Sequence, residues 1–250
     1  MIRKIASLTV LVCAAFGQPA APLTFSVASI RPHPDPSHSI GISTSGNRLT
    51  VEASYVGVII LYAYNLKNYQ LDTSKSLPAN DTMYDIAAKA EGDGTPTRDE
   101  FRQMLQSLLA DRFKLKVHRE MREIPVYALV IGKTGPRFKE TAPDAPLISN
   151  HGVNGRNQNV TMSHATMGGL ADDIENFFFA DRPVLDKTGL LAKYGIKLEA
   201  TPELRLNNNP QPGDVSIFDA IQQQLGLKLE PQKAMLEIVV VDRVEKPSAN

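Results

Sequence analysis

The second half of this sequence repeats the pattern of the first half, and this repeat limits the folds that the chain can adopt. Tyr84-Asp85-Ile86-Ala87 corresponds to Tyr194-Gly195-Ile196-Lys197, at an offset of 110. Residues 49–51 correspond to 160–162 at an offset of 111, and residues 113–117 to 225–229 at an offset of 112. Three matches in chain order at nearly one offset predict an internal duplication.

The first repeat contains a strong helix signal. Thr97, followed by Glu100 three residues later, is a capping-box pattern. Apolar residues then recur at helical spacing and form one stripe: Phe101, Met104, Leu105, Leu108 and Leu109. We therefore expect a helix that begins after Thr97 and packs this stripe against a core.

The second repeat has weaker helix signals. Ser216 with Asp219 is expected to cap a shorter helix, which Gly226 ends in a left-handed conformation. The acidic residues Asp172 and Asp173 are interpreted as the start of another helix, where carboxylates interact favourably with the helix dipole.

Strand patterns follow the helices in both repeats. Leu115 and Val117 alternate with polar residues, and residues 126–131 form a continuous apolar run after Pro125. In the second repeat, residues 227–229 and 236–241 read as strands with a turn at 231–234. The predicted fold class is therefore α+β, with two similar small units, each a mixed or antiparallel sheet with helices packed on one face.

The expected division of the chain follows from these signals. Residues 1–17 are a signal peptide, and residues 23–140 form the first α+β unit. Residues 141–159 are rich in Pro, Gly and Asn and are expected to be a linker. Residues 160–250 form the second unit.

The N-terminus resembles a secretory signal. Arg3 and Lys4 precede an apolar stretch at 5–16, and Ala15-Phe16-Gly17 offers small residues for cleavage. A membrane-spanning helix needs about 20 apolar residues, and this stretch is shorter. A lipid anchor on Cys13 is disfavoured because Val12 precedes it. We expect an exported protein of the periplasm or the extracellular medium, with no transmembrane segment in the mature chain.

Charge and cysteine content exclude some classes. The chain has 27 Lys+Arg and 27 Asp+Glu, so it lacks the basic surplus of a non-specific nucleic-acid binder. Cleavage after Gly17 would remove two basic residues and the only cysteine, leaving 27−2 = 25 basic against 27 acidic residues. Without a disulfide, the mature protein depends on core packing.

The sequence shows no convergent catalytic set. It has no Gly-x-Ser-x-Gly motif, and the mature chain has no thiol. His33 and His38 flank Asp35, but a Pro-rich loop is interpreted as solvated rather than as a metal site. His118 is expected on a strand surface beside Glu120. No catalytic residue, metal ion or cofactor is predicted.

The best candidate for a special loop is Asp186-Lys187-Thr188-Gly189. Asp186 can accept hydrogen bonds from backbone N–H groups further along the turn, and Gly189 can adopt a positive φ. A structural turn is favoured over a ligand contact. Asp85 and His118 complete the set of candidate ligand residues.

Several motifs together resemble a soil-associated, chiefly acidobacterial family of exported proteins of uncharacterised function. These motifs are Phe25-Ser26-Val27-Ala28-Ser29-Ile30-Arg31-Pro32, Tyr84-Asp85-Ile86, Leu108-Leu109-Ala110-Asp111-Arg112-Phe113, Pro125-Val126-Tyr127-Ala128-Leu129, Asp186-Lys187-Thr188-Gly189-Leu190 and Leu225-Gly226-Leu227-Lys228-Leu229. The resemblance implies an extracytoplasmic role, because related domains are joined to membrane metallopeptidase-type sensors. It also implies a Trp where this chain has Ala200 and an Asp where it has Gly195.

Two functions remain open from the sequence. The first is a non-catalytic extracytoplasmic module that binds an envelope protein, a membrane sensor or another envelope component. The alternative is a secreted hydrolase that uses carboxylates such as Asp85 and Asp186 in a cleft between the two units.

Overall fold

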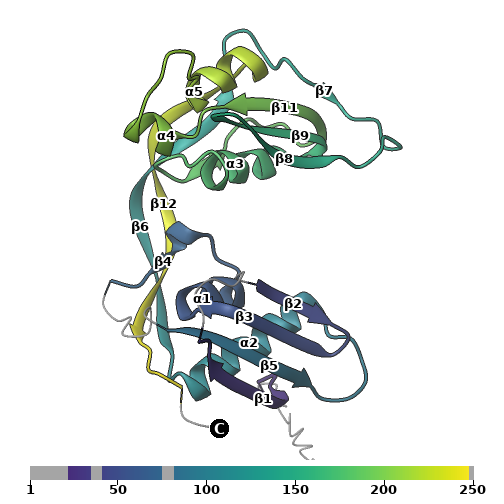
Figure 1. Ribbon diagram of the computed structural model, residues 1–250, viewed down its shortest axis with the longest axis vertical. Helices are drawn as coiled ribbons and strands as arrows, with labels where there is room; N and C mark the ends of the chain where they lie inside the picture. Colours follow the sequence, from purple (N-terminus) through teal and green to yellow (C-terminus); the bar gives the residue numbers. More distant parts are fainter. Residues whose placement is uncertain (1–21, 35–40, 75–81, 248–250) are drawn as a thin grey trace, which may run out of the picture. The chain divides into compact units, whose positions relative to one another are not determined.

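The computed structural model describes residues 22–34, 41–74 and 82–247 (Figure 1). The expected signal peptide at 1–17 lies outside these residues. The chain forms two compact units: unit 1 comprises residues 1–117 and 241–250, and unit 2 comprises residues 118–240. The α+β class predicted from the sequence is confirmed.

Unit 1 is built on an antiparallel sheet with the strand order β1-β5-β3-β2. Its strands are β1 (Phe25–Pro32), β2 (Gly41–Ser45), β3 (Arg48–Tyr55) and β5 (Met83–Ala90). The chain passes from β3 directly into α1 (Val56–Tyr64), then through a short 3₁₀ turn (Asn68–Gln70) and β4 (Leu71–Asp72). Helix α2 (Arg98–Arg112) follows β5.

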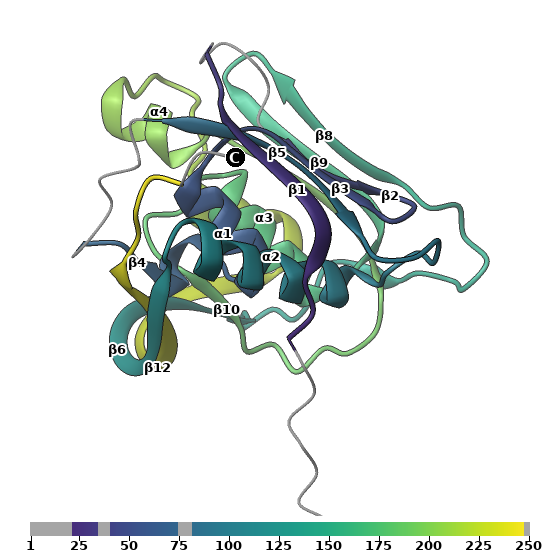
Figure 2. The ribbon, with the colours of Figure 1, turned by 90° about the horizontal axis from the view of Figure 1, so that it is seen from below.

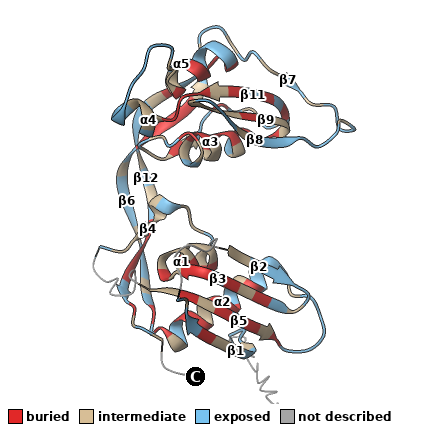
Figure 3. Cartoon of the chain, in the orientation of Figure 1, coloured by how far each residue is buried: buried red, intermediate tan, exposed pale blue. Residues whose placement is uncertain are grey.

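The helices α1 and α2 lie on one side of this sheet (Figure 2). The predicted stripe of α2 is confirmed, because its five apolar residues are all buried. Thr97 caps the helix: its Oγ1 accepts the N–H of Glu100 at 3.2 Å, and Glu100 accepts the N–H of Thr97 at 2.6 Å. Buried residues alternate with less buried ones along β5 (Figure 3). Val51 and Ile86 are among the strand residues that join the same core. The opposite face of the sheet carries the polar residues.

Unit 2 contains an antiparallel sheet with the strand order β7-β11-β9-β8. Its strands are β7 (Lys139–Glu140), β8 (Ser149–Asn154), β9 (Asn157–Ala165) and β11 (Tyr194–Ala200). Its helices are α3 (Met167–Asn176), α4 (Glu203–Asn208) and α5 (Ile217–Ala220), the last continued by a π-helical turn at Ile221–Leu225. As expected, Ser216 caps α5 by accepting the N–H of Asp219 at 3.1 Å, and Gly226 follows with φ 66°.

The antiparallel sheets of unit 1 and unit 2 pair in similar registers. Val51 faces Ile86 in unit 1, and Met162 faces Ile196 in unit 2. Thr50 and Thr161, one residue earlier, face Ala87 and Lys197. Lys114 and Gly226, 112 residues apart, both lie just after a helix and have positive φ, 52° and 66°.

A third sheet has the order β10-β6-β12-β4. Its strands are β6 (Lys116–Ile131), β12 (Leu227–Arg243), β10 (Val184–Asp186) and the short β4, and β10 runs parallel to β6. The expected turn at 231–234 is wrong, because β12 continues through it, as β6 continues through Pro125. A proline removes only one backbone N–H donor from the hydrogen bonds between strands. Ion pairs also link β6 to β12 here: Glu123 to Lys233 at 2.8 Å, and Arg119 to Glu237.

Other boundaries also differ from the expected ones. Unit 1 includes the C-terminal residues, and Val241 and Val244 are part of its core. The expected linker at 141–159 contains β8 and the start of β9. Asp172 and Asp173 lie in the second half of α3, which begins after Thr166, so their interpretation as a helix start was wrong.

Candidate functional site

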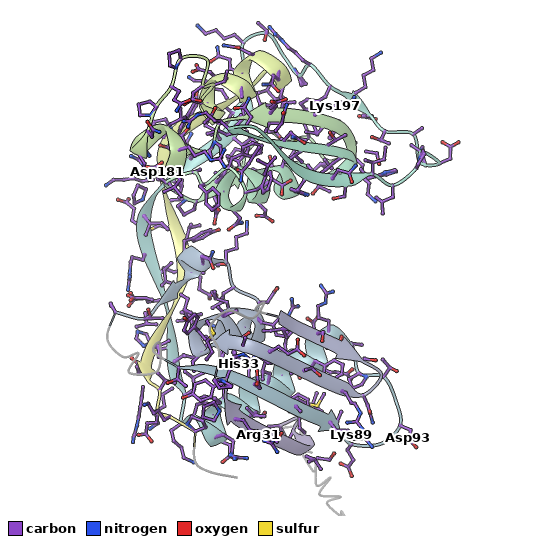
Figure 4. All side chains as sticks on the ribbon, viewed as in Figure 1. Arg31, His33, Lys89, Asp93, Asp181 and Lys197 are labelled. Atoms are coloured by element: carbon purple, nitrogen blue, oxygen red, sulfur yellow. The ribbon has the colours of Figure 1, made fainter. Side chains whose placement is uncertain are left out.

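The helix-free face of the unit 1 sheet carries a trough with a volume of about 620 Å³. Pockets of this size commonly hold small ligands. Arg31 and His33 lie toward one end of this sheet and Lys89 lies toward the other (Figure 4). The trough is lined by Ser29, Arg31, His33, Thr50, Val51, Glu52, Asp85, Ile86 and Ala87.

Strand alternation places the polar lining on one face. Successive side chains on a strand point to opposite faces, so the residues next in sequence to the buried Ile30, Val51 and Ile86 point away from the core. The register aligns Arg31 with Asp85, and Glu52 lies at the β3 irregularity beyond Asp85. The next row contains small side chains, since Ser29 and Thr50 both pair with Ala87. A charged row therefore borders a row of small residues.

Asp85 organises the charged row. Both of its carboxylate oxygens lie 2.9 Å from His33 Nδ1. Because a carboxylate only accepts hydrogen bonds, this nitrogen carries the proton. Asp85 Oδ1 also accepts the backbone N–H of Ala53 at 2.9 Å. Ala53 has φ 46° at the point where the β3–β5 register shifts.

Two charged side chains of the trough are available to a ligand. The Arg31 guanidinium and the Glu52 carboxylate form no hydrogen bond or ion pair with the residues described at 22–34, 41–74 and 82–247, and both residues are exposed. The hydroxyls of Ser29 and Thr50 are likewise unused within that part of the chain. The trough thus offers a cation, an anion and two hydroxyls.

His33 is not positioned to act as a general base. His33 is held by Asp85, its side chain is only 13% exposed, and its Nε2 atom is buried. A general base must reach the proton that it abstracts, and a buried nitrogen does not. Asp85, which contacts His33, lies between Arg31 and Glu52 in the strand order β1-β5-β3.

The sequence candidates Asp186, Lys187, Thr188 and Gly189 form a compact turn in unit 2. Asp186 Oδ1 accepts the N–H of Thr188 at 2.9 Å and its hydroxyl at 2.8 Å. Lys187 donates its N–H to Leu129 at 2.9 Å, and Gly189 has φ 72°. These contacts fasten the end of β10 to β6.

The remaining candidates belong to different units of the chain. Asp85 is in unit 1 and Asp186 in unit 2, so the hydrolase that joins them remains a prediction. His118 lies on β6, with its Nε2 3.6 Å from Glu120, and its side chain is 42% exposed. No group of His, Cys, Asp and Glu within the described ranges is arranged to hold a metal ion.

A second hollow in unit 1 has a volume of about 580 Å³. It lies beside Pro22–Thr24 and the start of α2, and its charged lining residues are Glu91 and Glu100. Because Glu100 already caps α2, this hollow offers fewer unused polar groups than the trough.

Unit 2 contains a polar cluster that fixes loops. Arg156 Nη2 lies 2.8 Å from Asp214 Oδ2, and Asp214 also accepts the N–H of Gln211 at 2.8 Å. The Asp214 side chain is 7% exposed, and its bond to Arg156 lowers its pKa to about 2. The contacts join the turn between β8 and β9 to the loop before α5.

Tyr127 and Glu203 form another group in unit 2. Burial raises the pKa of Tyr127, and the Asp181 carboxylate that accepts its hydroxyl adds to the increase. Arg182 lies 5.1 Å from the centre of the Tyr127 ring. Burial also raises the pKa of Glu203, and Asp181 and Asp219 contribute by repulsion.

Sequence reasoning missed Arg31, His33 and Glu52. His33 was interpreted as part of a solvated Pro-rich loop, but β1 extends to Pro32, and the N–H of His33 donates to the carbonyl oxygen of Met83 at 2.8 Å. The alternation of core-facing and outward-facing residues in 27–31 and 48–52 was the sequence signal that could have predicted these strands. Asp35 and His38 lie outside the described residues. Ala200, where the resemblance implies a Trp, is buried in the unit 2 core and so does not line a ligand surface.

Comparisons with known proteins give one match. No curated protein and no solved structure is significantly similar to the chain. Within the described residues, none of the helices is long and apolar enough to cross a membrane. A family model described as "Protein of unknown function (DUF3738)" matches residues 58–244, which include Asp85 and the Asp186 turn but not Arg31, His33 or Glu52. The chain therefore belongs to the DUF3738 family of proteins of unknown function.

Proposed function

We propose that this protein is a non-catalytic extracytoplasmic binding module that uses the unit 1 trough as its ligand site. The observation that carries the proposal is the pair of unused charges, Arg31 and Glu52, on either side of the fixed His33–Asp85 pair. Charges left available in a concave surface favour a polar ligand that can bind both of them.

We also propose that the protein is exported and arose by internal duplication. Export rests on the signal-like residues 1–17. Duplication is supported by the equal strand orders, the equal registers around Ile86 and Ile196, and the positive φ of Lys114 and Gly226. N-terminal sequencing of protein recovered from the periplasm or medium should begin at Gln18. Recovery of the intact N-terminus from the cytoplasm would refute export.

The binding function is tested by NMR titration with small molecules released from a bacterial envelope. We expect a subset to shift the amide resonances of β1, β3 and β5. A double variant, Arg31→Ala with Glu52→Ala, should lose these shifts while keeping its fold. Absence of any ligand at the trough, or turnover of a ligand by the wild-type protein that Asp85→Ala abolishes, would overturn the proposal.

A further inference from the structure

We infer that the trough binds a short zwitterionic peptide of about three residues, lying across the strands with its terminal carboxylate on Arg31 and its terminal ammonium on Glu52. The inference rests on the proposed binding function and names the ligand class. It is carried by the spacing and charge of three neighbouring side chains on three strands.

The spacing follows from the register. Arg31 on β1 pairs with Asp85 on β5, and Glu52 lies beyond Asp85 on β3. Neighbouring strands are about 4.8 Å apart, so two steps separate Arg31 from Glu52 by about 10 Å. An extended chain covers about 3.3–3.6 Å per residue, and three residues therefore span this distance.

The charges set the direction of the ligand. Arg31 can hold a carboxylate with two parallel N–H donors, whereas Glu52 can accept hydrogen bonds from an ammonium. Asp85 lies between them, but both of its oxygens face His33 Nδ1 at 2.9 Å. It therefore adds negative charge to the Glu52 side of Arg31, which disfavours a ligand that is only anionic.

The row of residues beside the charged row limits the size of the peptide side chains that the trough can hold, and we call this row the floor of the trough. The row next to the charges consists of Ser29, Ala87 and Thr50, all small. The two hydroxyls can bind the peptide groups of the ligand. Small side chains such as alanine suit this floor.

Unit 2 lacks an equivalent site. The register position of Arg31 and Asp85 is taken by Lys139 and Gly195. The position of Glu52, 111 residues on, is Ser163, whose Oγ accepts the N–H of Ile148 at 2.8 Å and donates to Pro146 at 2.6 Å. With neither carboxylate present and this hydroxyl already occupied, we expect one peptide per chain.

The test is calorimetric titration of the purified protein with trialanine, trialanine amide and N-acetyl-trialanine. Trialanine should bind with a stoichiometry of one, and either blocked peptide at least tenfold more weakly. Arg31→Ala should weaken trialanine at least tenfold but leave the amide nearly unchanged. Glu52→Gln should weaken the binding of trialanine at least tenfold but leave the binding of N-acetyl-trialanine nearly unchanged. Arg48→Ala, on the same face outside the trough lining, is the matched control and should change nothing.

The outcomes separate the two proposals. Two results would refute the zwitterionic ligand. The first is equal affinity for free and blocked peptides, and the second is a loss of trialanine affinity with Arg48→Ala as large as that with Arg31→Ala. Failure of trialanine to bind while a neutral saccharide binds in a manner that depends on Arg31 and Glu52 would refute the peptide but keep the binding function. Failure of every envelope-derived small molecule and peptide to shift the trough resonances would refute both.

Discussion

The Asp85 carboxylate accepts the backbone N–H of Ala53 at 2.9 Å, and Ala53 adopts φ 46° in the middle of β3. The left-handed backbone conformation is unfavourable for a residue other than glycine. Such a conformation persists where surrounding contacts hold it. Asp85 supplies such a contact and at the same time fixes His33, so one side chain shapes both the strand and the trough.

Replacing Asp85 should therefore destabilise unit 1. Asp85→Ala leaves the Ala53 N–H and His33 Nδ1 without this acceptor, and we expect a loss of about 1 kcal/mol in the free energy of unfolding, the lower end of the usual range because the Asp85 side chain is 40% exposed. Urea denaturation measures the loss. Glu52→Ala, on the same face, should change stability little, and equal losses in both variants would contradict the role of Asp85.

Lys114 follows α2 with φ 52°, a conformation that glycine adopts at low cost. Lys114→Gly should therefore raise the free energy of unfolding by about 1 kcal/mol. The opposite change at the other positive-φ residue that follows a helix, Gly226→Ala, should lower the free energy of unfolding, because a Cβ there would clash with the carbonyl oxygen of Gly135. Urea unfolding of both variants checks the signs, and a destabilising Lys114→Gly would count against this geometry.

The Arg156–Asp214 pair predicts a pH dependence of stability. The pKa of Asp214 is about 2 in the folded protein, below its ordinary 3.8. Such a carboxylate stabilises the fold fully above its unfolded pKa, and this stabilisation is lost as the pH falls through the folded value. At pH 6 the urea midpoint of the wild-type protein should be higher than that of Asp214→Asn. The difference between the two midpoints should shrink as the pH falls from roughly 5 to 2. A constant difference would exclude the ionised pair as its source.

The Tyr127 hydroxyl provides a spectroscopic test in unit 2. Burial raises its pKa first, and its hydrogen bond to Asp181 adds to the shift. Asp181→Asn removes the negative charge, so the pKa of Tyr127 should fall toward its ordinary value but remain above it. NMR titration of ring-labelled tyrosine follows this change. Tyr84, whose pKa is raised by burial in unit 1, is the internal control and should not move.

The elements that sequence patterns predicted are those defined by local signals. Helix α2 was predictable because its cap and its stripe lie within 97–109. The long strands β6 and β12 were not, because Pro125 and the polar residues between 118 and 124 resemble a turn unless the neighbouring strand is known. Pairing to a strand more than 100 residues away overrides the local pattern here, as Lys233 and Glu123 illustrate.

The trough was only partly predictable for the same reason. Asp85 stood out through its motif, but its partner His33 is 52 residues earlier and was interpreted as part of a solvated loop. Arg31 and Glu52 carry no motif of their own. Only the antiparallel register of β1, β5 and β3 brings the three charges into one row.

The placement of Val241 and Val244 in the core of unit 1 has a consequence for biosynthesis. A ribosome makes residues 118–240, all of unit 2, before it reaches them. The first unit to emerge is thus the last to acquire its complete interior, and a fragment ending at residue 140 would lack both of these core valines.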